Sequence, residues 1–369
     1  MKKFLLVCGA LFISAWGMGA DKSPSPLKAN FIEGSPTIRS MNALAFGPEG
    51  VLFVGDSRNA RIFAIDTQDE QPGEATEIKI QQFDEVVADV LGTTADKIAI
   101  QDIAVNPISK VIYFSVHHND GTPLLLKVVD NEIKTVPLEN IKFSEVRLND
   151  PVAEDAKDRR GRELRIWAVS DLSYHNGSVL VSGLSNQEFS STFRSIPFPF
   201  TGKQEHSSLE VYHAAHGQFE TFAPIKAFTA TEVNNEPHLI ASYTCTPLVV
   251  FPMNQLKPGE HVKGRTVAEL GNWNTPLDII TLEKEGRQYI LIANSNRALM
   301  KIKVSDIASF RDALTTPVKE RAATAGVDFI ALPFVNVQQL AKLDDSQFVV
   351  LQRKASGSLD LFTPGNRWL

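Results

Sequence analysis

The sequence predicts an all-β protein, a six-bladed β-propeller, on three observations. Short apolar strands separated by polar turns begin at residue 41, the same pattern recurs along the chain to give six copies, and each copy is followed by a further apolar strand. Four antiparallel strands per repeat, six times over, is the arrangement of a propeller. A pair of β-sandwiches predicts no such in-phase recurrence.

The first repeat defines the unit. Asn42–Phe46 and Val51–Gly55 are apolar runs joined by a Gly-Pro-Glu-Gly turn, and Arg61–Ile65 follows a polar turn. The matching segments are Ile100–His118, Val169–Leu184, Ile225–Cys245, Pro276–Asn296 and Asn336–Arg353. Their spacing gives a repeat of about 60 residues with uneven insertions.

The remaining strands of each blade are weaker in the sequence. We expect third strands at 61–65, 123–129, 208–214, 247–252, 298–304 and 358–363, and fourth strands at 77–83, 134–138, 218–222, 266–270 and 328–332. The sixth repeat ends after its third strand, whereas a spare extended segment, Leu27–Glu33, precedes the first. We therefore predict that this N-terminal strand closes the last blade, because closure removes an exposed strand edge.

The first 20 residues have the pattern of a secretory signal peptide. Lys2 and Lys3 precede an apolar run from Phe4 to Trp16, and small residues follow as far as Ala20. The run is shorter than the roughly 18 residues that indicate a spanning helix. The sequence therefore predicts a single propeller domain over 21–369, extracytoplasmic (periplasmic or secreted), with no membrane insertion.

Composition narrows the partners. Cys8 falls in the signal peptide, which leaves Cys245 alone in the mature chain, so we expect stability to come from a large core without an internal disulfide. The net charge of −6 disfavours nucleic acid and anionic membrane surfaces as partners.

Two strand pairs resemble NHL repeats. The stretch VLFVGDSRNARI at Val51–Ile62 has the valine-rich strand, aspartate-serine turn and following asparagine and arginine of such a repeat, and ILIANSNR at Ile290–Arg297 echoes it. The resemblance implies a propeller distantly similar to those of the gluconolactonase and paraoxonase type, which carry calcium in the central channel. Their first-blade glutamate would correspond to Asn42 or Ala43 here.

Long insertions are expected to gather on one rim. Asp84–Ala99, which contains a short amphipathic helix, and the charged Ser144–Arg165 lead into innermost strands, while the phenylalanine-rich Asn186–Ser207 joins a second strand to a third. Loops this long are usually functional or disordered. Their convergence predicts a lidded pocket on that rim.

Equivalent positions of the six repeats predict a metal site at the axis. They are occupied by Ala43, Asp102, Asp171, Ala227, Asp278 and Gln338. Three carboxylates about 6 Å apart would repel pairwise by about 3 kcal/mol at an effective dielectric near 20. Ca²⁺, bound by Asp102, Asp171 and Asp278 with an amide oxygen such as that of Asn294, would offset this repulsion. The alternative is that each aspartate caps its own turn through backbone N–H groups.

The turns between second and third strands supply the candidate rim-binding residues, which are His117, His118, Tyr243, Cys245, Asn296 and Arg353. His117, His118 and Cys245 have side chains that suit zinc or copper. Only one of two adjacent histidines on a strand can face the centre, which favours a rim histidine and a buried, inert cysteine. His206, His213 and His216 read as surface polar sequence on a strand and turn.

The sequence contains no Gly-x-Ser-x-Gly elbow, Walker loop, HExxH or CxxC. The leading hypothesis is therefore an exported propeller that binds a ligand or protein partner through its insertion-bearing rim. The alternative is a calcium-dependent hydrolase or lactonase with the ion in the central channel, and a purely structural protein is a third class. Whether the chain is an enzyme stays open at this stage.

Overall fold

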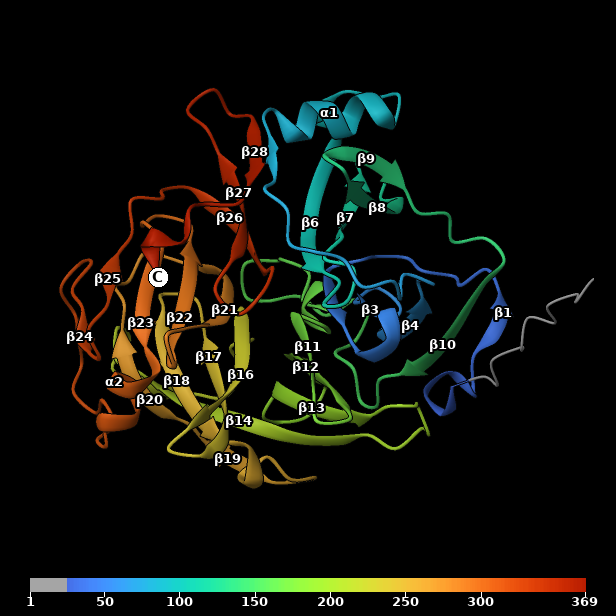
Figure 1. Ribbon diagram of the computed structural model, residues 1–369. Helices are drawn as coiled ribbons and strands as arrows, with labels where there is room; N and C mark the ends of the chain where they lie inside the picture. The colour runs from blue at the N-terminus through green and yellow to red at the C-terminus, as the bar shows by residue number, and fades with distance from the viewer. Residues whose placement is uncertain (1–24) are drawn as a thin grey trace, which may run out of the picture.

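The computed structural model describes residues 25–369, which form a six-bladed β-propeller (Figure 1). Six antiparallel sheets surround a common axis, and one edge strand of each sheet lines the centre. The predicted fold class is confirmed. The predicted signal peptide, residues 1–20, lies outside the described range.

We number the blades by the chain order of their innermost strands and give each blade from the axis outward. Blade 1 contains β2 (Ala43–Phe46), β3 (Val51–Asp56), β4 (Arg61–Asp66), β10 (Ile141–Arg147) and β1 (Ile32–Gly34). Blade 2 contains β6 (Ile98–Val105), β7 (Ile112–His118), β8 (Pro123–Val129) and β9 (Glu132–Thr135). Blade 3 contains β11 (Asp171–His175), β12 (Ser178–Leu184), β13 (Ser191–Pro197), β14 (Glu205–His213) and β15 (Gln218–Glu220), with β19 (His261–Lys263) parallel to β14.

The remaining three blades follow one another along the chain. Blade 4 contains β16 (Ala227–Val233), β17 (Glu236–Ser242), β18 (Pro247–Pro252), β20 (Arg265–Glu269) and β24 (Ala325–Gly326). Blade 5 contains β21 (Pro276–Lys284), β22 (Arg287–Asn294), β23 (Met300–Lys303) and β25 (Ile330–Ala331). Blade 6 contains β26 (Val337–Lys342), β27 (Phe348–Arg353), β28 (Leu359–Phe362) and β5 (Lys79–Ile80).

Helices are few. The amphipathic helix expected near residue 84 is α1 (Phe83–Val90), and α2 (Val304–Ser309) follows β23. Short 3₁₀ turns lie at Pro26–Lys28, Pro48–Gly50, Ala95–Lys97, Arg165–Trp167, Met253–Gln255 and Asn366–Trp368. None of the helices within residues 25–369 has the length and apolar character needed to cross a membrane.

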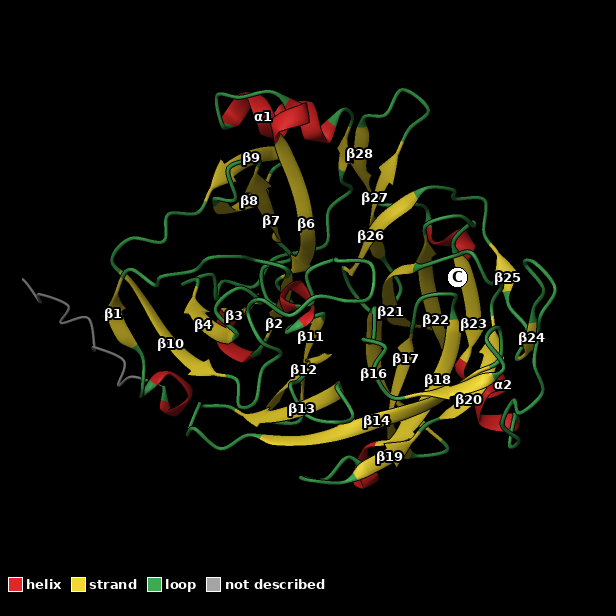
Figure 2. Cartoon of the chain, turned by 180° about the vertical axis from the view of Figure 1, so that it is seen from behind, coloured by secondary structure: helices red, strands yellow, loops and turns green. Residues whose placement is uncertain are grey.

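The order of the blades around the axis differs from their order in the chain. The innermost strand of blade 1, β2, packs against both β6 and β11, and β6 packs against β26. The ring therefore runs 2-1-3-4-5-6, with blade 2 between blades 1 and 6, as Figure 2 shows from behind. After β4 the chain crosses to blade 6, builds blade 2, and returns to blade 1 through β10.

This crossing overturns the predicted closure of the ring. The last blade is completed by β5, whose Ile80 pairs with Leu361 of β28, and not by the N-terminal segment. That segment instead supplies β1, which pairs with β10 at the outer edge of blade 1. The 77–83 segment is therefore the fourth strand of blade 6, because β10 already occupies that position in blade 1.

Blade 3 also differs from the expectation. Its third strand is β13, which lies inside the segment 186–207 that was expected to be a loop, and the 208–214 segment belongs to the fourth strand, β14. Ile196 and Phe193 of β13 are buried on opposite faces of the sheet. The phenylalanines that suggested a binding loop are therefore partly core residues.

Six apolar clusters, one at each interface between neighbouring blades, form the core. Phe53 of β3 belongs to the cluster that contains Val181 of blade 3, whereas Val54 belongs to the cluster that contains Tyr113 of blade 2. Successive side chains of a strand point to opposite faces, so a strand between two blades buries both faces. The continuous apolar runs of the second strands have this cause.

Candidate functional site

The three aspartates lie in the innermost strands β6, β11 and β21 and bond the backbone of two blades each. One oxygen of each accepts the N–H of the next residue in its own strand, at 2.8 Å for Asp102, 2.8 Å for Asp171 and 2.7 Å for Asp278. The other oxygen accepts an N–H of the neighbouring blade, from Leu44 at 2.7 Å, Phe228 at 2.8 Å and Leu340 at 2.6 Å respectively.

These contacts alternate around the ring. Blades 2, 3 and 5 carry an aspartate, and blades 1, 4 and 6, which alternate with them, offer the N–H that it accepts. Ala43 and Ala227 occupy the aspartate position in blades 1 and 4, so the backbone N–H that follows each has no aspartate of its own strand to bond. We call these three pairings the aspartate clasps.

The clasps are electrostatically costly. Desolvation raises the pKa of Asp102 and Asp171 well above the usual range, and repulsion from Asp278 raises both further. Desolvation raises the pKa of Asp278 to about 7. The repulsion places the three carboxyl groups within electrostatic reach of one another.

The Ca²⁺ ion expected at these aspartates stays a prediction. All six carboxylate oxygens already accept a backbone N–H, so an ion would have to use their remaining lone pairs. Asn294 does not turn toward them. Its buried side chain bonds Asn274 at 2.8 Å and the Ile292 carbonyl at 2.9 Å, and so holds its own turn.

An axial cavity of about 700 Å³ begins at the aspartate clasps. It follows the innermost strands to the turns at their other end, where Lys110, Asp344 and Asp345 line it. Its wall carries Ser173, Tyr174, Thr229, Thr231, Thr281 and Gln288. None of the long segments 84–99, 144–165 and 186–207 contributes to this lining.

The candidate rim residues of blade 2, His117 and His118, have different contacts. His117 Nε2 accepts the N–H of Met41 at 2.9 Å, and desolvation together with nearby Arg58 lowers its pKa. His118 lies 3.3 Å from the exposed Asp120 carboxylate. Adjacent histidines thus have different surroundings, as the strand geometry predicted.

The other rim candidates do not form one site with these histidines. Tyr243 is buried between blades 3 and 4. Asn296 donates to the Trp273 carbonyl at 2.7 Å, in the segment that precedes β21 of the same blade, and Arg353 donates to the Gly357 carbonyl at 2.7 Å within its own turn.

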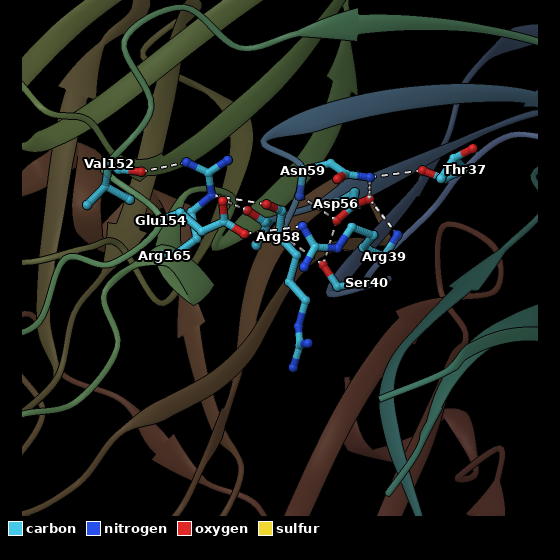
Figure 3. A network of polar contacts seen from close by, with 10 residues as sticks. Thr37, Arg39, Ser40, Asp56, Arg58, Asn59, Val152, Glu154 and Arg165 are labelled. Carbon is cyan, nitrogen blue, oxygen red and sulfur yellow. Dashed lines mark hydrogen bonds and ion pairs between the residues drawn. The ribbon is translucent and has the colours of Figure 1, made fainter. Parts of the chain in front are cut away.

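The turn of blade 1 on this rim is fixed by a buried carboxylate (Figure 3). Asp56 accepts from the Arg39 N–H at 2.7 Å, from Ser40 Oγ at 2.8 Å and from both the N–H and the side chain of Asn59. Arg165 joins the long segment to this turn by donating to the carbonyls of Val152 and Ser57. The Asp-Ser-Arg-Asn turn, on which the resemblance to NHL repeats rested, is thus a structural cap.

Cys245 has partners that the sequence did not reveal. Cys245, His213 and His216 each place one potential ligand atom within 4.8 Å of the other two. Among the residues that the structure describes, this is the cluster of three or more His, Cys, Asp or Glu side chains close enough to share a metal ion. His213 is buried, which corrects its assignment to the surface. The missed signal was the His-x-x-His spacing followed by Glu220, which the β14–β15 hairpin folds into one place.

A smaller cavity of about 260 Å³ lies on the same rim of blade 3. It is lined by Gln187, Phe189 and His206 from the long segment, with Glu260 from the loop that precedes β19. The Phe189 ring packs on His261 at 4.2 Å between ring centres. Of the three long segments expected to converge on a lidded pocket, 186–207 lines this cavity, whereas 84–99 and 144–165 do not.

Comparison with protein-family models and with curated proteins found no match. Similar solved structures include an oxidoreductase (glucose dehydrogenase) from Thermus thermophilus, with 11% sequence identity, a TM-score of 0.36 and coverage of 90% of this chain and 99% of that chain. Another is the PQQ-bound form of an aldose sugar dehydrogenase from Streptomyces coelicolor, with 12% identity, a TM-score of 0.32 and coverage of 91% and 98%. Similarity at this level says nothing of ligand or reaction.

Proposed function

We propose that the protein is an exported binding module that takes a small polar ligand in its axial cavity and meets a further partner at its insertion-bearing rim. The observation that carries the proposal is the axial cavity itself. Its volume of about 700 Å³ falls within the range of small-molecule sites, roughly 300–1,000 Å³.

The lining favours a neutral or cationic ligand rich in hydroxyl or amine groups. Thr229 and Thr281 bond each other through their hydroxyls at 2.9 Å, and Thr231 donates to Gln288 at 3.3 Å, so the wall presents both donors and acceptors. The aspartate clasps at one end and Asp344 and Asp345 at the other disfavour an anion. Lys110 and Lys342 are the cations of this lining, and Lys342 pairs with Asp345 at 2.7 Å.

A ligand panel tests this proposal. Glucose, spermidine and citrate represent neutral, cationic and anionic classes, and we expect the melting temperature to rise with a member of the first two classes but not with citrate. Gln288→Trp should fill the cavity and abolish that rise. Thr135→Trp, on the exposed outer strand β9, is the control and should retain it. A rise that survives Gln288→Trp would place the ligand elsewhere.

The rim cavity supports a separate partner site. The half-exposed Phe189 is an aromatic anchor of the kind that dominates interfaces. Deleting the whole segment would remove β13, so the test is Phe189→Ser. We expect it to reduce capture of a partner from the periplasm or medium, whereas Thr135→Trp should not. Equal capture by both variants would remove the rim proposal.

The alternative function, a calcium-dependent hydrolase or lactonase, is favoured by the mutual repulsion of Asp102, Asp171 and Asp278. An ion at the remaining lone pairs would be held by these carboxylates and would polarise a substrate carbonyl. If the alternative holds, Ca²⁺ raises the melting temperature and EDTA lowers it. A melting temperature indifferent to both would leave the aspartates as clasps alone.

A further inference from the structure

Two histidines of blade 3 meet a cysteine of blade 4 on the rim. His213 ends β14, His216 lies in the turn that follows, and Cys245 lies in the turn between β17 and β18. One potential ligand atom from each lies within 4.8 Å of the other two. His213 is 2% exposed, whereas the His216 side chain is 44% exposed, so the group is closed on one side and open on the other.

A single carboxylate orients both imidazoles. Glu220 Oε2 lies 3.0 Å from Nδ1 of His213, and its Oε1 lies 2.6 Å from Nδ1 of His216. These contacts leave Nε2 of each ring as the nitrogen free to bind something else. Histidines that bind metals almost always direct the other ring nitrogen to such an acceptor, which fixes their orientation.

One of these nitrogens is an orphan within the protein. His213 Nε2 is buried and has no hydrogen-bond partner among the described residues. A buried polar atom left unsatisfied is destabilising, so a missing partner is indicated. The neighbouring Cys245 sulfur and His216 ring point to the nature of that partner, because imidazole and thiolate together are the ligands of zinc and copper.

The backbone holds the three side chains in place. The N–H groups of His216 and Gly217 donate to the His213 carbonyl at 3.1 and 2.8 Å, which closes the turn. Cys245 has a φ of 65°, uncommon for a residue with a side chain, and its N–H donates to the Asn274 carbonyl at 2.8 Å. A conformation of this kind persists where surrounding structure imposes it and clusters at functional sites.

We propose that His213, His216 and Cys245 bind a zinc ion, with Glu220 as the carboxylate that positions both imidazoles. Two imidazoles and one thiolate supply three of the four ligands of a tetrahedral zinc site. The fourth position would face the exposed side, beside His216, and take water or a ligand. The Glu220 carboxylate, which contacts both imidazoles, adds negative charge that favours a cation here.

This site is independent of the axial cavity, since none of its residues lines that cavity. Loss of ligand binding in the cavity would therefore leave the zinc proposal standing. Binding of zinc would displace the thiol proton of Cys245, so affinity should fall as the pH is lowered.

Metal titration tests the proposal. The mature protein, kept reduced and stripped with a chelator, is titrated with Zn²⁺ by calorimetry and with Co²⁺ by absorption spectroscopy. We expect one equivalent of Zn²⁺ to bind and Co²⁺ to give a thiolate-to-metal charge-transfer band. Cys245→Ser should abolish that band, and Glu220→Gln should weaken zinc binding by about 10- to 100-fold.

The His216 side chain is 44% exposed, so His216→Ala is the variant with the smallest risk of misfolding. We expect His216→Ala to lose at least as much zinc affinity as Glu220→Gln. His175→Ala, a partly exposed histidine of β11, is the matched control and should bind zinc as the wild type does. Circular dichroism checks the fold of each variant. Absence of stoichiometric zinc binding in the wild type, or binding unaltered in both His216→Ala and Cys245→Ser, would overturn the proposal.

Discussion

At the scale of single residues, the aspartate clasps combine a backbone role with an electrostatic cost. Hydrogen bonds to a charged group contribute about 1.5–3 kcal/mol each, and every clasp makes two. Desolvation and mutual repulsion act against this gain, as the raised pKa values of Asp102, Asp171 and Asp278 indicate. The clasps therefore join neighbouring blades best when at least one of the three carboxyl groups carries a proton.

This cost predicts a pH dependence of stability. The pKa of Asp278 is about 7 in the folded protein, above the ordinary value of 3.8, so at intermediate pH the folded chain holds a proton that the unfolded chain has lost. The bound proton stabilises the folded chain fully below pH 3.8, the ordinary pKa of an aspartate, and this stabilisation is lost as the pH rises through about 7. We expect Asp278→Asn to weaken the wild-type fall in urea midpoint between about pH 5 and pH 8, measured with EDTA present.

The control for this measurement is an aspartate with the opposite shift. Asp96 is exposed, and a hydrogen bond from the Thr94 side chain lowers its pKa, so it is ionised throughout that range. Asp96→Asn should therefore leave the slope unchanged. Equal slopes in Asp278→Asn and the wild type would show that Asp278 does not carry this proton.

At the scale of elements, the sequence located inner strands and several outer strands, such as β9, β20 and β25, but not always the blade to which an outer strand belongs. Second strands such as β3 are buried on both faces, and this gives the continuous apolar run at 51–54 from which the repeat was recognised. The outermost strands β1, β9 and β25 are short and carry few buried side chains. Nothing local to Leu27–Glu33 or to 77–83 tells which of them closes blade 6, because the choice depends on a crossing over blade 2.

The candidate site was predictable to a similar degree. Equivalence of the repeats placed Asp102, Asp171 and Asp278 at the axis, because the period fixes which residues of the innermost strands correspond to one another. The same period could not locate His213. Its strand, β14, runs past β13 and packs against β20 of blade 4, so its end meets Cys245 of another blade.

The closing strand can be tested against the strand that was expected to close the ring. Ile80 of β5 is 8% exposed and packs in the cluster that contains Leu361, whereas Ile32 of β1 is 60% exposed. We expect Ile80→Ala to cost about 2–3 kcal/mol of unfolding free energy and Ile32→Ala less than about 0.5 kcal/mol, measured by urea denaturation. The reverse ranking would indicate that the N-terminal segment closes the ring.

At the scale of the whole molecule, the six apolar clusters form a closed circuit. Every blade shares one cluster with each neighbour, so loss of one blade exposes two interfaces. Blade 1 combines strands from distant parts of the chain, because β2, β3 and β4 precede blade 2 in the sequence whereas β10 follows it. The ring is thus held by contacts between segments distant in the chain, and we expect it to unfold in one cooperative transition.

Cutting the chain between β4 and β5 tests this interlocking. A protease site inserted between Gln71 and Pro72, both exposed, would separate a fragment carrying β1 to β4 from the remainder. The small fragment is clamped by the pairing of β4 with β10, by the clusters on both faces of β3, and by the bond from the Leu44 N–H to Asp102. We expect both fragments to elute together from a sizing column after complete cleavage and to separate only in denaturant. If the small fragment elutes on its own in native buffer, its contacts with β10 and with the two neighbouring blades are too weak to retain it. The six apolar clusters would then not explain why the ring stays closed.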